Sequence, residues 1–238
     1  MRRPAVAPRF ACALLLAGAG SAAALTPAEV YALVAPSVWR VVTYDGDGLP
    51  LGQGSAVVVG AEALATNCHV LARAKRVVVR HEKTSFDARL DLWDIQRDLC
   101  QLRAAGLTAP PVRIAPTASV VVGATVYAIG TPRGLELTMS AGLVSSLRKN
   151  AAGQVVLVQT SASISGGSSG GGLFDDSGAL VGLTTLKIAG DAQNLNFAIP
   201  ADWIVDLPER HGRLSKKPGA SAIDSDKSAP AALPQPGR

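Results

Sequence analysis

The sequence is poor in aromatic, charged and histidine residues. Of its 238 residues, 4% are aromatic and 17% are charged. Basic residues nowhere alternate with aromatic ones, so no nucleic-acid partner is expected. The three cysteines and three histidines form no cluster with the spacing of metal ligands, so neither a metal nor another cofactor is expected. No apolar run is long enough to cross a bilayer as a stable helix.

The composition that remains is that of a globular chain with many turns. Hydrophobic residues make up 48% of the sequence, which excludes a wholly disordered or collagen-like protein. The 24 glycines and 15 prolines favour short segments joined by turns over a helical bundle. The length fits one or two domains, and no repeat or internal linker divides it.

Short runs rich in β-forming residues alternate with turn residues along the middle of the chain. These runs are Val38–Tyr44, Ser55–Val59, Arg76–Arg80, Leu90–Trp93, Thr125–Ile129, Val155–Gln159 and Leu180–Leu186. Such spacing is typical of an antiparallel sandwich or barrel. We therefore predict an all-β fold, with two barrels as one arrangement and a short helix near each end.

The first residues have the pattern of a secretory signal peptide. Residues 1–24 contain Arg2, Arg3 and Arg9, then a run of about ten apolar residues and an A-x-A end. This pattern predicts cleavage after Ala24 and export to the periplasm or out of the cell, with no membrane span left after cleavage. An uncleaved membrane anchor is the alternative.

The last residues are expected to lie outside the fold. Residues 208–238 are rich in Pro, Ala and Ser and predict a flexible tail, so the expected domain is 25–207. Its first helix is indicated by the capping box Thr26-Pro27-Ala28-Glu29, and helical periodicity returns only at 201–207. The positive charge belongs to the two ends, because residues 25–206 contain 14 Lys or Arg and 15 Asp or Glu.

Chemically useful side chains occur in three segments. His69 follows an apolar run, and Asp98 precedes another strand-like run. The third segment, Gly166–Gly172, carries Ser169 in a glycine-rich turn between two β-rich segments. Backbone N–H groups in such a turn can approach a developing oxyanion without obstruction by Cβ atoms. Taken singly, His69 also fits a core histidine and Asp98 a strand-capping acid.

The glycine-rich turn has other possible interpretations. A Gly/Ser-rich linker would have this composition, but core-like segments lie on both sides. The turn also matches G-x-S-x-G, the nucleophile elbow of α/β-hydrolases. That fold needs the order Ser, acid, His, and the only downstream histidine, His211, lies in the expected tail. A phosphate-binding loop is excluded because no Gly-Lys-Ser/Thr follows the glycines.

Together these segments resemble HtrA-like bacterial serine proteases of the trypsin fold. The resemblance spans about residues 35–205. It rests on Gly54-Ser55-Ala56-Val57, Thr66-Asn67-Cys68-His69, Asp98-Leu99-Cys100, Gly130 to Leu135, Ser140 to Ser145, Gln159 to Gly172 and Asn196 to Pro200, which occur in the family's order. It implies two antiparallel six-stranded β-barrels with the active site between them. No PDZ domain, which many of these proteases carry, is recognised in the sequence.

The resemblance also assigns roles to individual residues. Ser169 would be the nucleophile, His69 its general base, and Asp98 the carboxylate that fixes the imidazole tautomer. The N–H groups of Gly167 and Ser169 would form the oxyanion hole. Ser168 stands where trypsin has an aspartate that pairs with a new N-terminus. Activation by N-terminal cleavage is therefore not expected.

The substrate pocket and a disulfide follow from the same resemblance. Ser163 would lie at the base of the primary pocket, with Asn196, Phe197 and Ala198 along its wall. No acid is present there to pair a Lys or Arg side chain, so a small or medium apolar side chain is expected. If the triad forms, Cys68 and Cys100 flank it, and we expect them to be disulfide-bonded in an oxidising compartment. The alternative is a pair of buried free thiols.

Three functions are consistent with these residues. The first is a serine endopeptidase that acts on a protein or peptide through an acyl-enzyme. The second is a trypsin-fold module that binds peptides or unfolded protein without cleaving them, and the third is an esterase with the same triad. The sequence indicates neither a natural substrate nor an oligomeric state.

Overall fold

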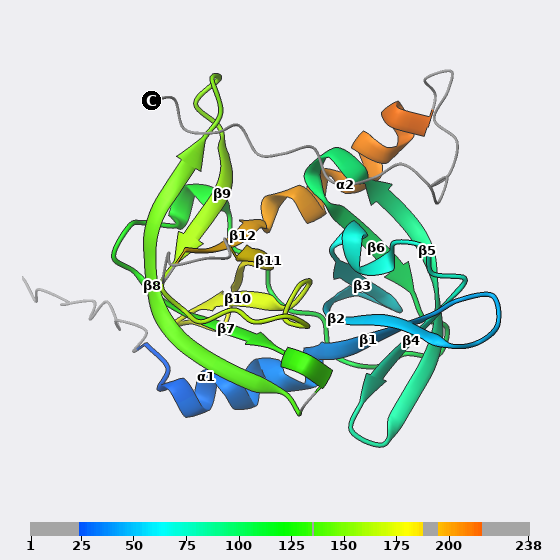
Figure 1. Cartoon of the computed structure of the whole chain (residues 1–238). Coiled ribbons are helices and arrows are strands. Elements are labelled where there is room, and N and C mark those ends of the chain that lie inside the picture. The colour runs from blue at the N-terminus through cyan, green and yellow to red at the C-terminus, as the bar shows by residue number, and fades with distance from the viewer. Residues whose placement is uncertain (1–23, 135, 188–194, 216–238) are drawn as a thin grey trace, which may run out of the picture.

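The chain folds into two closed, antiparallel six-stranded β-barrels. The computed structural model describes residues 24–134, 136–187 and 195–215. The first barrel has the strand order β1-β2-β3-β6-β5-β4 and the second the order β10-β11-β12-β9-β8-β7 (Figure 1). The prediction of an all-β fold with two six-stranded barrels is confirmed. Each run that was predicted as a strand lies within a strand of the structure.

The bounds of the elements are as follows. The first barrel contains β1 (Val38–Tyr44), β2 (Pro50–Gly60), β3 (Ala63–Thr66), β4 (Arg76–His81), β5 (Thr84–Asp94) and β6 (Leu99–Arg103). The second contains β7 (Thr125–Gly130), β8 (Thr138–Lys149), β9 (Val155–Thr160), β10 (Gly172–Asp175), β11 (Leu180–Lys187) and β12 (Asn196–Pro200). The α-helices are α1 (Pro27–Val34) and α2 (Asp202–Ser215), and the 3₁₀ turns are η1 (Ala35–Ser37), η2 (Cys68–Leu71), η3 (Ile95–Arg97), η4 (Thr117–Ser119) and η5 (Pro132–Gly134).

Three apolar clusters form the core of the protein. Inward-facing side chains fill each barrel, with Leu102 fully buried in the first and Leu173 fully buried in the second. The third cluster contains residues of both barrels, such as Val57 and Phe174, together with Leu207 of α2. Because apolar burial is the main favourable term in folding, this shared cluster fixes one barrel against the other. The candidate site lies where the two meet.

The predicted capping box begins α1. The Thr26 hydroxyl accepts from the Glu29 N–H at 3.3 Å, and the Glu29 carboxylate accepts from the Thr26 N–H at 2.8 Å. These bonds satisfy N–H groups that have no partner inside the helix. The buried residues Val30 and Val34 pack into the shared cluster.

The expected tail boundary at residue 208 is wrong, because α2 continues through Pro208 to Ser215. The helix is held against the first barrel by contacts that the sequence does not reveal. Arg97 donates to Asp206 at 2.7 Å, and the ring of His211 lies edge-on to that of Trp93 at 4.1 Å. These long-range contacts outweigh the hydrogen bond that the proline removes.

The remaining terminal predictions fall outside the described residues. The proposed signal peptide occupies residues 1–24, of which only Ala24 is described, and the rest of the proposed tail is 216–238. Across the described ranges, no helix is both long and apolar enough to cross a membrane.

Candidate active site

His69 lies in η2, three residues after Thr66, the last residue of β3. Its side chain is 39% exposed, so an incoming molecule can reach it. The segment before it is anchored by two buried polar groups. The Thr66 hydroxyl donates to the Ser55 carbonyl at 2.7 Å, and the Asn67 amide donates to the Asp98 carbonyl at 2.9 Å. The end of β3 therefore places His69 beside the segment that carries Asp98.

Asp98 lies between η3 and β6 and holds His69 at two points. It adopts a left-handed conformation with φ 53°. One carboxylate oxygen accepts from the His69 backbone N–H at 2.9 Å, and the other lies 2.7 Å from His69 Nδ1. A carboxylate accepts but does not donate, so this contact places the proton on Nδ1 and leaves Nε2 as an acceptor. That is the tautomer a general base requires.

A disulfide joins the segments that carry these two residues. Cys68 and Cys100 are bonded, with a Cα–Cα distance of 4.9 Å and a sequence separation of 32. The bond connects the residue before His69 to the residue two after Asp98. The expected pairing is present, and the alternative of two buried free thiols is wrong.

Ser169 lies in the tight turn that precedes β10. Gly170 has φ +83°, and a Cβ placed there would lie 2.1 Å from the Ser55 carbonyl oxygen. The Ser169 carbonyl accepts from the Ser55 N–H at 2.8 Å. Because Ser55 belongs to β2, the serine turn of the second barrel is packed directly on the first.

The Ser169 hydroxyl donates to the carbonyl of Thr185 at 2.9 Å. No hydrogen bond joins it to His69 within the described part of the chain. Thr185 also donates its own hydroxyl to Asp98 at 3.0 Å. One residue of β11 thus contacts both the acid and the serine.

Sequence reasoning missed Thr185. It lies in the run Leu180–Leu186, which was interpreted only as a core strand. The residue is 8% exposed. The hydroxyl of a threonine in a buried strand needs a hydrogen-bond partner. This requirement was the only feature of the sequence that indicated a polar contact at Thr185. The identity of that partner, Asp98, depends on how the two barrels pack.

Three N–H groups of the glycine-rich turn, those of Gly166, Gly167 and Ser169, are unused by the described residues. Ser168, Gly170 and Gly171 donate to the carbonyls of Ser165, Thr184 and Ser168 respectively. The N–H groups of Gly167 and Ser169 donate to no described group. Gly167 has φ +94°, and a Cβ there would meet the Arg133 N–H nitrogen at 2.7 Å, so glycine is required. The two N–H groups that the resemblance assigns to the oxyanion hole, those of Gly167 and Ser169, are therefore unoccupied, as an oxyanion site requires.

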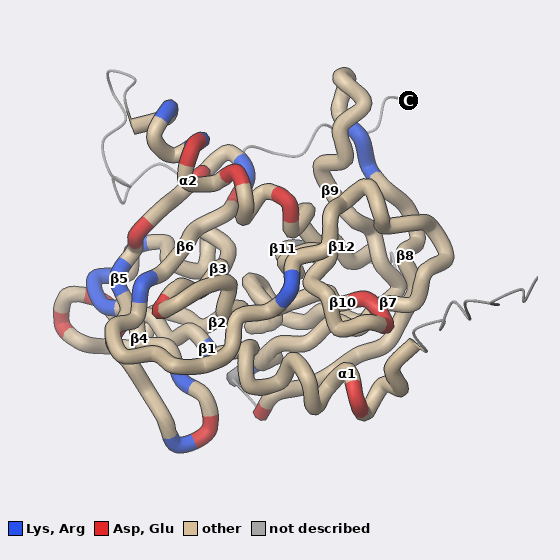
Figure 2. The backbone as a smooth tube through the Cα atoms, turned by 180° about the vertical axis from the view of Figure 1, so that it is seen from behind, with Lys and Arg blue, Asp and Glu red and all other residues tan. Residues whose placement is uncertain are grey.

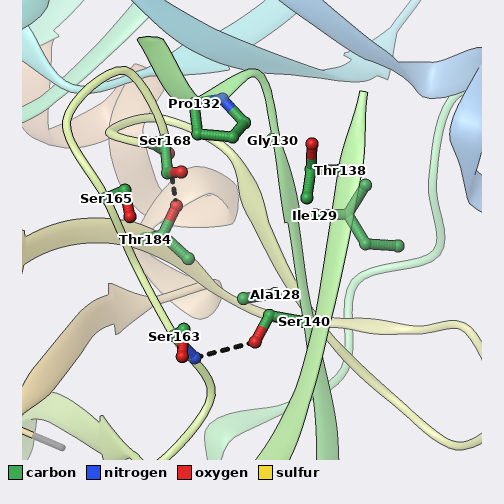
Figure 3. A pocket seen from close by; sticks show the side chains of 10 residues that line it. All are labelled: Ala128, Ile129, Gly130, Pro132, Thr138, Ser140, Ser163, Ser165, Ser168 and Thr184. Atoms are coloured by element: carbon green, nitrogen blue, oxygen red, sulfur yellow. Dashed lines mark hydrogen bonds between the residues drawn. The ribbon is translucent and has the colours of Figure 1, made fainter. Parts of the chain in front are cut away.

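A small cavity lies behind this turn. Its volume is about 110 Å³, and six hydroxyl side chains line it (Figure 3): Thr138, Ser140, Ser163, Ser165, Ser168 and Thr184. No Asp, Glu, Lys or Arg side chain is among its described lining residues. Ser163, expected at the base of the primary pocket, is one of them, and its N–H donates to the Ser140 hydroxyl at 2.9 Å.

The other residues expected in the pocket do not line this cavity. Asn196, Phe197 and Ala198 lie in β12, where they are paired between β11 and β9. All three are at most 4% exposed. The structure therefore does not join Ser163 and β12 in one cavity among the described residues. Residues 188–194, which precede β12, are not described.

Comparison with known proteins identifies the family. The model of the trypsin-like peptidase domain matches residues 54–183. The chain is 34% identical over 209 residues to Protease Do-like 1 of Arabidopsis thaliana chloroplasts, covering 80% of this chain and 47% of that protein. It is 36% identical over 201 residues to the serine endoprotease DegS of Haemophilus influenzae, covering 78% and 58% respectively. The chain thus spans about half the length of these relatives.

A solved structure shares the same fold. The HtrA-type protease AlgW, in complex with a tripeptide, superposes with a TM-score of 0.70 and 29% identity, covering 76% of this chain and 62% of that one. The resemblance to HtrA-like proteases that the motifs indicated is confirmed. The family match covers parts of both barrels, and His69, Asp98 and Ser169 lie within it. The chain belongs to the trypsin-like peptidase domain family.

Proposed function

We propose that the protein is a serine endopeptidase, with Ser169 as nucleophile, His69 as general base and Asp98 as the residue that orients the imidazole. The observation that carries the proposal is the pairing of His69 Nδ1 with Asp98 at 2.7 Å, together with a serine turn in which the N–H groups of Gly167 and Ser169 are unused. A serine hydroxyl attacks an amide only when a base removes its proton. The orientation of His69 leaves Nε2 as that base.

The proposed reaction has two stages. The Ser169 hydroxyl turns from Thr185 towards His69, and its oxygen bonds to the scissile carbonyl carbon as its proton passes to Nε2. The N–H groups of Gly167 and Ser169 bind the oxyanion. The C–N bond then breaks, His69 protonates the departing amine, and an acyl-enzyme remains. Water, deprotonated by His69, hydrolyses the ester and regenerates Ser169.

Thr185 supports this reaction by positioning two groups. Its hydroxyl donates to the Asp98 oxygen that also contacts His69. This bond holds the carboxylate in the orientation in which it contacts the imidazole. Its carbonyl accepts from Ser169 in the resting protein, so the hydroxyl occupies a defined place before substrate arrives.

We propose cleavage after small or medium apolar residues such as Ala, Val or Leu. Ser163 carries a neutral hydroxyl at the position that the family resemblance places at the base of the primary pocket, and the cavity it lines has no described acid. A peptide library will show whether cleavage follows these residues. Strict cleavage after Arg or Lys would contradict this preference.

We further propose that the protein acts in the periplasm or outside the cell, after removal of residues 1–24. The Cys68–Cys100 disulfide supports an oxidising compartment, because such bonds are rare where thiols are kept reduced. A related protein of Ectopseudomonas mendocina is named a probable periplasmic serine endoprotease. The N-terminal sequence of the protein recovered from its own cells tests the cleavage site, and an intact residue 1–24 segment would contradict it.

Hydrolysis of an unfolded protein tests the proposed activity. We expect the wild type to degrade β-casein to peptides, and Ser169→Ala to leave it intact. Ser145→Ala is the matched control, because Ser145 is an exposed serine of β8 outside the site, and we expect wild-type activity from it. Casein that is bound but not cleaved by wild type and Ser169→Ala alike would favour the non-catalytic binding module. Hydrolysis of activated esters without any cleavage of casein would favour the esterase.

A further inference from the structure

A basic groove lies on the first barrel, beside the turn that carries His69. It is an open cavity of about 600 Å³ between the η2–β4 connection and the paired strands β4 and β5. Four cations line it, Arg73, Lys75, Arg76 and Arg89, with one acid, Asp87. We call this feature the basic groove.

The single acid of the groove is already paired. Arg76 donates to Asp87 at 2.7 Å, and this hydrogen bond lowers the pKa of the Asp87 carboxyl. Arg73, Lys75 and Arg89 form no ion pair within the part of the chain that the structure describes. All three are exposed. Three cations are therefore available to a ligand.

The charge of this region contrasts with the rest of the domain. Residues 71–91 contain six Lys or Arg and three Asp or Glu, whereas the rest of residues 25–206 contains eight and twelve. Figure 2 shows the basic positions gathered over β4 and β5. The first barrel thus presents a local positive field on a body that is otherwise acidic, and such a field attracts anionic ligands.

The floor of the groove identifies the kind of anion. Leu71, Val77 and Leu90 line it among the cations, so it offers apolar contacts as well as charge. No aromatic side chain is among its described lining residues, and aromatic stacking is what single-stranded nucleic acids use. A peptide segment that combines Asp or Glu with apolar side chains complements both features.

The groove is within reach of a polypeptide held at the active site. Leu71 and Arg73 follow His69 by two and four residues, and four residues span at most about 14 Å. An extended substrate covers that distance with about four residues beyond the scissile bond. We propose that the basic groove binds an acidic segment of the polypeptide whose cleavage we propose at Ser169, so that substrates carrying such a segment are selected. This inference rests on the proposed function.

Binding without cleavage tests the groove directly. The full chain with Ser169→Ala is titrated against fluorescent peptides of about sixteen residues that share one apolar centre. One peptide has Asp and Glu on both flanks, and its counterpart has Asn and Gln. We expect the acidic peptide to bind at least tenfold more tightly at low salt. This preference should disappear in 0.5 M NaCl, because salt screens exposed charges.

Matched charge reversals locate the effect. We expect Arg73→Glu/Lys75→Glu in the Ser169→Ala background to abolish the preference for the acidic peptide. Arg148→Glu/Lys149→Glu makes the same change in charge at exposed positions on the second barrel. We expect this control variant to retain the preference for the acidic peptide. Circular dichroism and the melting temperature verify that both variants fold.

Three results would overturn the inference: equal affinity for the two peptides, a preference unchanged by the groove reversal, or equal loss in both double variants. Tighter binding of a poly-dT oligonucleotide than of the acidic peptide, lost in the groove variant, would assign the groove to nucleic acid instead. Cleavage with Ser169 present separates the two proposals. If neither peptide is cleaved, the proposed activity fails while the binding result stands. If both peptides are cleaved at the same rate, the proposed selection through the groove is wrong while the proposed activity stands.

Discussion

Reduction of the Cys68–Cys100 disulfide should remove a large part of the stability of the protein. The bond closes a loop with a sequence separation of 32. In the chain-entropy treatment, a loop of this length destabilises the unfolded chain by about 3.5–4 kcal/mol. The free energy of unfolding of a whole domain is commonly about 5–15 kcal/mol, so the reduced protein should unfold at a markedly lower urea concentration.

Equilibrium urea unfolding of the protein without residues 1–24, followed by tryptophan fluorescence, measures this loss. Comparison with and without reductant isolates the cross-link, because the reduced protein keeps both sulfur atoms. The double variant Cys68→Ala/Cys100→Ala should lose a further 1–2 kcal/mol or so, since both side chains are buried and their removal leaves space in the barrel. A free energy of unfolding that reductant changes by less than about 1 kcal/mol would refute the reasoning.

Three further predictions concern stability. Gly170→Ala should lower the free energy of unfolding in urea by about 3 kcal/mol or more, because the added Cβ would meet backbone at 2.1 Å. The control Gly46→Ala has open space around it and should cost under about 0.5 kcal/mol. Equal costs for the two variants would contradict the close packing at Gly170. Arg210→Ala removes a partner of the fully buried Asp94 carboxylate and should lower the free energy of unfolding by about 2–4 kcal/mol. The control Arg213→Ala removes an exposed ion pair and should cost under about 0.5 kcal/mol. A larger loss in Arg213→Ala than in Arg210→Ala would be inconsistent with α2 bracing the first barrel. Partial burial acts to raise the pKa of Asp91, but hydrogen bonds and charge from its arginine and glutamine partners outweigh the burial, so the pKa is lowered. The resulting stabilisation is present above about pH 4 and is lost as the pH falls through the folded pKa. Asp91→Asn should therefore flatten the acid side of the stability–pH curve, and an unchanged curve would disprove this assignment.

The features that the sequence predicted correctly depend on local patterns or on motif order. The capping box at Thr26 and the strand β1 are local, and neighbouring residues determine them. His69 and Asp98 lie 29 residues apart in the chain, and only the order of the family's motifs indicated that they meet. A contact of Ser169 with His69 stays a prediction. Periodicity alone does not bring them together.

The features that were missed depend on contacts between distant segments. Strand β8 was not predicted, because its small residues show no apolar alternation. Gly142 of β8 passes so close to Ala162 that a Cβ would lie 2.2 Å from its backbone nitrogen, and a local pattern does not encode such a crossing. The extension of α2 past Pro208 depends on Asp94 and Arg97 of the first barrel. The role of Thr185 likewise depends on its contact with Asp98.

The most direct test of the account is whether Ser169 is an activated nucleophile. The folded protein is incubated with a fluorophosphonate, a reagent that esterifies the activated serine of serine hydrolases, and the product is measured by intact mass and peptide mapping. We predict one adduct per chain, located on Ser169, and none on Ser169→Ala or on unfolded wild type. Folded wild-type protein that remains unmodified, or an adduct that persists in Ser169→Ala, would contradict the proposed catalytic site.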